Sequence, residues 1–257
     1  MHGTARRIRL PLLLAAMLCL ALAAGSAAAA TDGKGAPKAG TGTTTAKGNA
    51  DATPAGTSPA LFGEFRYNAP KAEIAALKDA VPAEGEFAGD ILLPPADFAG
   101  HRWTPRLSFD GDRLVRVSLM ARVPALESER LEAVRGHLAK EGYEVLGLVA
   151  DGKTLDCISR LKIGYATTGD APAALAKDMA KFLEGRHARI TYAWFDTKGL
   201  SRENKRTARN LGDFLVLAPA ETREAEVTLI PDPGGKEAML LVDFTYPILD
   251  AMRNGQK

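Results

Sequence analysis

The chain has 257 residues, of which 46% are hydrophobic and 25% charged, and its formal net charge is +2. This composition can supply one large hydrophobic core or two small ones. A net charge this small excludes a strongly basic protein of the kind that binds nucleic acid through its overall charge.

Residues 1–30 have the pattern of an export signal. Three arginines among the first nine residues precede an apolar run over residues 10–24, and the alanines at 28–30 offer a signal-peptidase site. We expect general secretion with cleavage near Ala30, because Arg9 stands where a twin-arginine signal has an aromatic or apolar residue. The apolar run is shorter than the roughly 20 residues that span a bilayer, so we expect no transmembrane span after cleavage. We expect the destination to be the periplasm or the extracellular medium.

Cleavage would change the charge and the cysteine content. It removes three arginines and no acid, which leaves 30 Lys and Arg against 31 Asp and Glu and a net charge of −1. We therefore expect no nucleic-acid partner. Cys19 follows Leu18 inside the apolar run, unlike the lipidated cysteine of a lipoprotein signal. Only Cys157 remains in the mature chain, so an internal disulfide is impossible.

Residues 31–59 contain Ala, Gly, Thr, Pro and Lys but no large apolar side chain. Such a segment buries too little surface to offset the entropy lost on ordering it, so we expect a disordered tether. The α+β globular region is expected over 60–257. It should begin near Leu61 with a short helix after Pro70 that ends at Pro82, and residues 86–104 should be irregular.

The next segment predicts a β-hairpin over residues 105–123, because apolar and polar residues alternate and a turn sequence lies at 110–112. A two-residue loop would mix the faces of the two strands. A three-residue loop pairs Leu107 with Val115 and Arg106 with Arg116, which keeps one face apolar, so we prefer it.

The middle of the chain predicts helices and a second hairpin. An amphipathic helix is expected over 127–141 and another over 172–184. A strand should begin at Tyr143 and pair with a strand over 155–163 that carries Cys157 on its apolar face. With a strand over 188–195, the order of elements would allow a right-handed parallel crossover.

The last part predicts a short basic helix over 201–211, strands over 213–218, 224–230 and 238–244, and a helical turn from Pro247. Together these elements predict an α+β fold: a mixed, mostly antiparallel sheet with β-hairpins and three to four helices packed on it. The similar lengths of 69–85 and 171–185 suggest two related α-β units, although two unrelated helices after Ala-Pro would look the same. A subdivision near 124–170 stays open.

Few residues suggest chemistry. Cys157 could pair with a histidine as a nucleophile, but its place on an apolar strand face favours a core thiol. His101, His137 and His187 lack the spacing of metal or catalytic motifs, and we expect no metal and no cofactor. The Asp-Gly turns at 110–112 and 151–152 are explained by turn chemistry. A glycosidase-type carboxylate pair cannot be recognised from sequence and stays open.

Two basic clusters are the candidate binding residues. On the helix over 201–211, four cations at i, i+3, i+4 and i+7 would form one positive stripe, and on the first hairpin two arginines would face each other across the strands. Either cluster could bind an anionic partner such as a phospholipid headgroup, an envelope polymer or an acidic protein, or could be a solvated surface. The residues are Arg202, Lys205, Arg206, Arg209, Arg106 and Arg116.

The stretch from Leu61-Phe62-Gly63 to Ala72-Glu73-Ile74, followed by paired strands, resembles the helix-plus-sheet modules of SmpA/OmlA-type outer-membrane assembly lipoproteins. The chain lacks the lipidated cysteine of that family, so the resemblance implies no site residue here. Three functions remain. We expect a non-catalytic binding or assembly protein of the cell envelope. The alternatives are a hydrolase acting on envelope material, with carboxylates or a histidine gathered in a cleft, and a purely structural domain.

Overall fold

A computed structural model of the protein describes residues 58–124, 129–167 and 170–255, without the side chains of residues 165–167, Arg202 and Lys205. The expected export signal and all but the last two residues of the expected tether lie outside these residues. Ser58–Lys257 form one compact unit. No helix of the described residues is long and apolar enough to cross a membrane.

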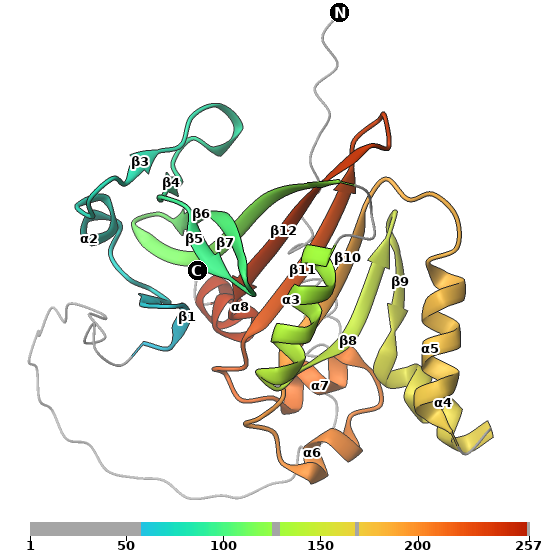
Figure 1. Ribbon diagram of the computed structural model, residues 1–257. Coiled ribbons are helices and arrows are strands. Elements are labelled where there is room, and N and C mark those ends of the chain that lie inside the picture. Colours follow the sequence, from blue (N-terminus) through green and yellow to red (C-terminus); the bar gives the residue numbers. More distant parts are fainter. Residues whose placement is uncertain (1–57, 125–128, 168–169, 256–257) are drawn as a thin grey trace, which may run out of the picture. The chain divides into compact units, whose positions relative to one another are not determined.

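The fold is α+β, as the sequence predicts, and its centre is a ten-stranded sheet (Figure 1). The strand order is β3–β4–β6–β7–β12–β11–β10–β8–β9, β5 pairs with β6, and every described pair is antiparallel. The strands are β3 (Val81–Pro82), β4 (Ile91–Leu92), β5 (Ala96–Phe98), β6 (His101–Asp110), β7 (Arg113–Pro124), β8 (Tyr143–Ala150), β9 (Lys153–Asp156), β10 (Ile190–Asp196), β11 (Glu224–Pro231) and β12 (Glu237–Thr245). A separate pair is formed by β1 (Ala60–Phe62) and β2 (Phe65–Arg66).

The described helices outnumber the three to four expected. They are α2 (Lys71–Ala75), α3 (Glu129–Lys140), α4 (Cys157–Thr167), α5 (Ala171–Phe182), α6 (Arg202–Thr207), α7 (Leu211–Leu217) and α8 (Pro247–Gly255), with the 3-10 turn η1 (Gly85–Phe87). The two segments that suggested related α-β units differ, because α2 has five residues and α5 has twelve. The predicted helix after Pro70 therefore ends well before Pro82.

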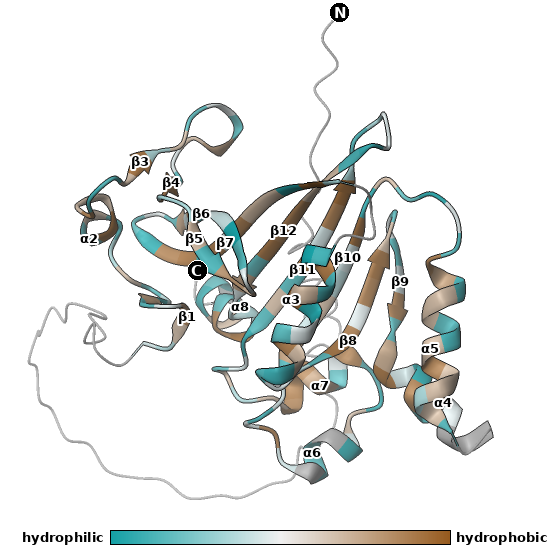
Figure 2. Cartoon of the chain, in the orientation of Figure 1, coloured by the Kyte–Doolittle hydropathy of each residue, from teal (hydrophilic) through white to brown (hydrophobic). Residues whose placement is uncertain are grey.

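One face of the sheet forms the hydrophobic core, and we call it the core face. Cross-strand partners share a face, and the row through the centre of the sheet on this side is apolar and buried. The row runs Leu119, Val242, Val227, Tyr192, Leu148 and Leu155. Helix α3 covers it with its buried Leu131, Val134 and Leu138, and Figure 2 shows the hydrophobic residues concentrated along these strands.

The opposite side of the sheet, which we call the second face, is mixed in character. Ser118, Asp243 and Glu226 are cross-strand partners on β7, β12 and β11. Toward β8, helix α7 packs on this face, where the Phe214 and Phe195 rings lie 5.4 Å apart between centroids. The sheet therefore separates a side without charged residues in its central row from one that carries charged groups.

The predicted register of the first hairpin is wrong. Leu107 pairs with Val117 and Arg106 with Ser118, and the register shifts between Ser108 and Phe109. This bulge adds a residue to β7, so a two-residue turn at 111–112 can close the hairpin while the apolar alternation is kept. Arg106 and Arg116 are consequently not cross-strand partners.

Two predicted strands are partly or wholly helical. The strand expected over 155–163 ends at Asp156, whose carboxylate accepts the Ser159 N–H at 3.0 Å and so starts α4. The same carboxylate accepts the Leu211 N–H at 2.8 Å, where α7 begins. The strand expected over 213–218 is α7, and Asn210 caps it by accepting the Asp213 N–H.

The parallel crossover predicted between the strands over 155–163 and 188–195 does not join neighbouring strands. Strand β8 lies between β9 and β10 and pairs antiparallel with both, so β9 and β10 run in the same direction without being neighbours. Helices α4 and α5 connect them. Six other predicted elements are confirmed. Strands β10, β11 and β12 correspond to the strands predicted over 188–195, 224–230 and 238–244. Helices α3, α5 and α8 correspond to the helices predicted over 127–141 and 172–184 and to the last helical turn, except that residues 127–128 lie outside the described residues.

Candidate functional site

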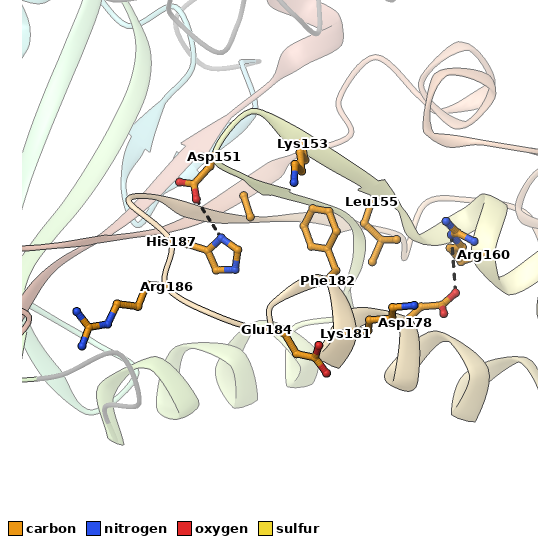
Figure 3. Close-up of a pocket in the computed structure, with 11 residues that line it drawn as sticks. Asp151, Lys153, Leu155, Arg160, Asp178, Lys181, Phe182, Glu184, Arg186 and His187 are labelled. Carbon is orange, nitrogen blue, oxygen red and sulfur yellow. Dashed lines mark hydrogen bonds and ion pairs between the residues drawn. The ribbon is translucent and has the colours of Figure 1, made fainter.

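A pocket of about 600 Å³ lies between the β8–β9 turn, α4, α5 and the loop before β10 (Figure 3). Its lining is rich in charge, with four Lys or Arg, three Asp or Glu and one histidine. The lining residues are Ala150, Asp151, Lys153, Leu155, Arg160, Asp178, Lys181, Phe182, Glu184, Arg186 and His187. Four separate segments thus bring their polar side chains to one concave site.

Asp151 and His187 form a hydrogen-bonded pair at this pocket. Asp151 lies in the β8–β9 turn with φ 48° and accepts the N–H groups of Ala188 at 2.9 Å and Arg189 at 3.0 Å. Its other oxygen is 3.0 Å from His187 Nδ1. Desolvation raises the pKa of the Asp151 carboxyl, but the hydrogen bonds from Arg189, His187 and Ala188 outweigh it and lower the pKa. The pair fixes the imidazole in one orientation.

His187 Nε2 is buried and has no hydrogen-bond partner among the described residues. Since Nδ1 faces the Asp151 carboxylate, Nε2 is the ring nitrogen that has no partner; it accepts a hydrogen bond in the neutral ring and donates one in the protonated ring. Figure 3 shows His187, Phe182 and Lys153 next to one another, whereas the Arg186 side chain points away from them. The pocket therefore offers a polar contact beside an apolar ring.

Positive charge is in excess around the pocket. Arg160 is paired with Asp178, with 3.8 Å between Nε and Oδ2. In the described part of the chain no ion pair involves Lys153 or Lys181. A small anion is the ligand that such a set of side chains favours.

The sequence does not predict this pocket. It shows a turn at Asp151 and a histidine at 187, but nothing in the spacing of residues 150–187 indicates that the two side chains meet. The signal that could have connected them is the pairing of β8 with β10, which places the turn at the end of β8 beside the residues that lead into β10.

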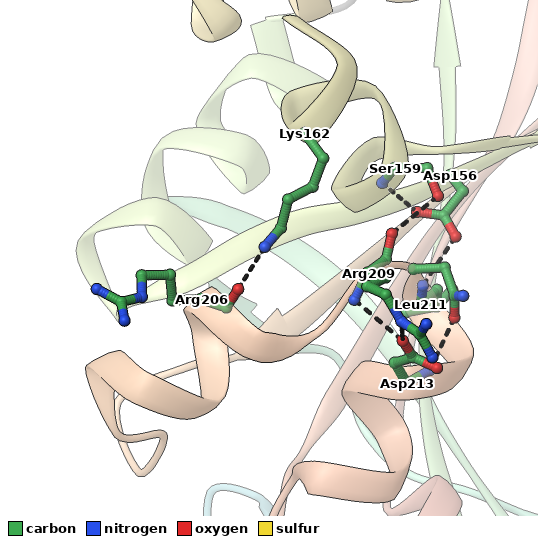
Figure 4. Close-up of polar contacts among 8 residues, drawn as sticks. Asp156, Ser159, Lys162, Arg206, Arg209, Leu211 and Asp213 are labelled. Atoms are coloured by element: carbon green, nitrogen blue, oxygen red, sulfur yellow. Dashed lines mark hydrogen bonds and ion pairs between the residues drawn. The ribbon is translucent and has the colours of Figure 1, made fainter. Parts of the chain in front are cut away.

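The basic stripe predicted for one helix is interrupted, because Arg206 lies on α6 whereas Arg209 lies in the link between α6 and α7 (Figure 4). Helix α6 ends at Thr207 and Ala208 is extended, so Arg209 does not continue its face. Arg209 Nε instead lies 2.9 Å from Asp213 Oδ2, and its hydrogen bond lowers the pKa of that carboxyl. The Arg206 carbonyl accepts Lys162 Nζ, while its exposed side chain points away from the other labelled residues in Figure 4.

The side chains of Arg202 and Lys205 lie outside the described residues. The predicted stripe of four cations on one helical face is therefore not formed, because a cap at Asn210 begins a new helix after α6. Binding by these residues stays a prediction.

Arg106 is part of the packed sheet. It is 9% exposed, its Nη2 donates to Ser118 Oγ at 3.4 Å, and its Nε lies 3.4 Å from Asp90 Oδ2. The Phe87 ring centroid is 3.9 Å from its guanidinium carbon. Burial lowers the pKa of Arg106, while Asp243 and Asp90 oppose that shift. Arg116 is half-buried and pairs with Ser108 across the strands, so these two arginines form no exposed basic surface.

Cys157 is fully buried at the start of α4, and burial, with the nearby Asp156 charge, raises its thiol pKa to about 12. The core role expected from sequence fits this burial, although the residue is helical. Across residues 58–124, 129–167 and 170–255, no group of three or more His, Cys, Asp or Glu is placed to hold a metal ion.

No protein-family model matches the chain, and comparison with curated proteins and with solved structures gives no match either.

Proposed function

We propose that the protein is an exported, non-catalytic binding protein of the cell envelope, and that the pocket beside Asp151 and His187 binds an anionic envelope component. The unpartnered Nε2 of His187 carries this proposal. A protonated imidazole held by a carboxylate donates a charge-assisted hydrogen bond to an anion, and Lys153 and Lys181 add attraction at longer range.

Inorganic phosphate is the simplest probe of the pocket, measured by calorimetry at low ionic strength. We expect His187→Gln and Lys153→Gln each to weaken phosphate binding at least fivefold. Lys177→Gln is the matched control, because this exposed lysine lies on α5 outside the pocket lining. Added salt should weaken binding. Equal affinities for all four proteins would reject the pocket.

The envelope partner is tested by co-sedimentation with an envelope fraction. We expect His187→Gln to lower the bound fraction. Substitution of Arg206 and Arg209 by glutamate measures how much these two basic residues contribute to binding of the envelope fraction. A wild-type protein that binds neither phosphate nor the envelope fraction would favour a purely structural domain.

A hydrolase is the second candidate, favoured by the Asp151–His187 pair, which has the geometry of a general base held by a carboxylate. The pocket lining contains no Ser, Thr or Cys, and attack by a water molecule activated at His187 is the simplest hydrolytic route. Release of product from phosphate or carboxylic esters, lost in His187→Gln, would support this activity. Phosphate binding without turnover would favour the binding protein.

A further inference from the structure

The second face of the sheet changes from acidic to apolar along its strands. Side chains at i and i+2 share a face and lie about 6.7 Å apart. On β11 this face carries Glu224, Glu226, Thr228 and Ile230 in turn, and on β12 it carries Asp243, Leu241 and Met239. On β7 the same face carries Arg116 and Ser118 near the acids and Met120 and Arg122 beyond them. Glu226 and Asp243 are direct cross-strand partners. Three carboxyl groups are thus placed together at one end of the face.

Two of these carboxyl groups have oxygens without a hydrogen-bond partner. Glu224 is 4% and Asp243 is 7% exposed, and Glu224 Oε1 and Asp243 Oδ1 have no partner among the described residues. The other Glu224 oxygen accepts the Thr245 hydroxyl at 3.4 Å. A buried acceptor without a donor is costly, so these oxygens favour an occupant that carries N–H or O–H donors.

The other end of the face carries an apolar patch on the three central strands β7, β12 and β11. Met120 pairs with Leu241, and Met239 pairs with Ile230, so the four side chains are contiguous. All four are only half-buried, whereas Leu119, Leu240 and Leu229 beside them on the core face are buried. Apolar surface thus stays partly open directly beside the acidic end.

A metal ion fits the acidic end poorly, because no group of three or more carboxylates among the described residues is placed to hold one. An organic cation is larger and spreads several N–H donors over separate oxygens. We propose that the second face binds a cationic amphiphile, with a primary ammonium group between Asp243 and Glu226 and an alkyl chain over Met120, Leu241, Met239 and Ile230. This site is distinct from the pocket and does not rest on the proposed function.

The charges around Glu226 predict how binding depends on pH. Burial and the neighbouring Asp243 raise the pKa of Glu226 to about 7, while Arg116 and Arg189 oppose that shift. Glu224 also has a raised pKa, from burial and from Glu226. The row of cross-strand partners through Glu226 also contains Arg106 on β6, with Asp90 against it, and Asp156 on β9. Binding of an ammonium group should strengthen as the pH rises from 6 to 8, because Glu226 then loses its proton.

n-Octylamine is the probe, and its binding is measured by calorimetry below its micelle concentration. n-Octanoate tests the charge of the head group, and n-butylamine tests the length of the alkyl chain. We expect octylamine to bind at least tenfold more tightly than either. Glu226→Gln and Leu241→Thr should each weaken it at least fivefold. Glu132→Gln, an exposed acid on α3 over the core face, is the matched control and should change nothing.

Thermal melting of each variant separates loss of the site from loss of the fold, and the pH profile of the wild-type protein needs no variant. No octylamine binding, equal binding of octylamine and octanoate, or unchanged affinity in folded Glu226→Gln would each overturn the proposal. Affinity that does not rise between pH 6 and 8 would also overturn it.

Discussion

The Arg106 guanidinium forms an ion pair with Asp90 and interacts electrostatically with Asp243. It also stacks over the Phe87 ring. Its burial explains why a residue that the sequence offered for docking contributes to the sheet instead. The sequence shows the arginine but not the β-bulge, which sets the strand register that places Ser118 opposite Arg106.

Arg106→Gln should lower the free energy of unfolding by about 3 kcal/mol, because removal of one partner leaves a buried acid uncompensated. Arg122→Gln is the control, since its ion pair with Glu237 is largely exposed and should be worth under about 1 kcal/mol. Urea denaturation measures both. Equal losses would mean that Arg106 contributes no more than a surface charge.

Strand β11 should make the stability of the protein depend on pH. The unfolded chain loses the Glu226 proton near pH 4.5, and the folded chain loses it near pH 7. Between these values the folded state binds more protons, so stability falls as the pH rises, at up to about 1.4 kcal/mol per pH unit for one group, and levels off above pH 7. Glu224 should extend the fall to higher pH, because its pKa is also raised.

Urea midpoints measured from pH 4 to pH 8 test this dependence. Glu226→Gln should flatten the curve and raise the midpoint at pH 8, whereas the exposed Glu237→Gln should leave its shape unchanged. A wild-type midpoint that rises from pH 5 to pH 7 would contradict the assignment.

Elements whose periodicity agrees with their packing could be predicted from the sequence. In β11 the buried Ala225, Val227 and Leu229 alternate with residues of the second face, and this pattern specifies a strand. The seven residues of α7 are mostly apolar, and so short a segment fits a strand or a helix equally well. Only the Asn210 cap and the packing of Phe214 on Phe195 decide for the helix.

The candidate sites were less predictable than the elements. The pocket depends on which strands pair, and the acidic end of the second face depends on the register of β11 with β12. Register is a long-range property, because a shift by one residue would move Glu226 to the core face. The sequence shows the charged residues of both sites, but it does not show which of them lie next to one another in space.

At the scale of the whole molecule, contacts join the first described segment to the last helix. The Tyr67 hydroxyl donates to Asp250 Oδ1 at 2.7 Å, and the Tyr246 hydroxyl donates to the Ala60 carbonyl at 2.6 Å. Arg253 then links Asp250 to Asp110 in the first hairpin. The two ends of residues 58–255 are therefore held by the same network.

A double-mutant cycle with Tyr67→Phe and Asp250→Asn should give a coupling energy of about 1.5 kcal/mol, as for a hydrogen bond to a charged group. Urea denaturation of the wild type, the two single variants and the double variant supplies the measurement. Additive losses would show that the hydroxyl and the carboxylate act independently.

The Asp156 carboxylate accepts the N–H groups of Ser159 and Leu211 and so caps two helices that are distant in sequence. α4 and α7 should consequently open together rather than one by one. Asp156→Asn keeps the size of the side chain but loses one strong acceptor oxygen. In that variant, amide hydrogen exchange should accelerate at both Ser159 and Leu211, while the amides of β11 keep their protection.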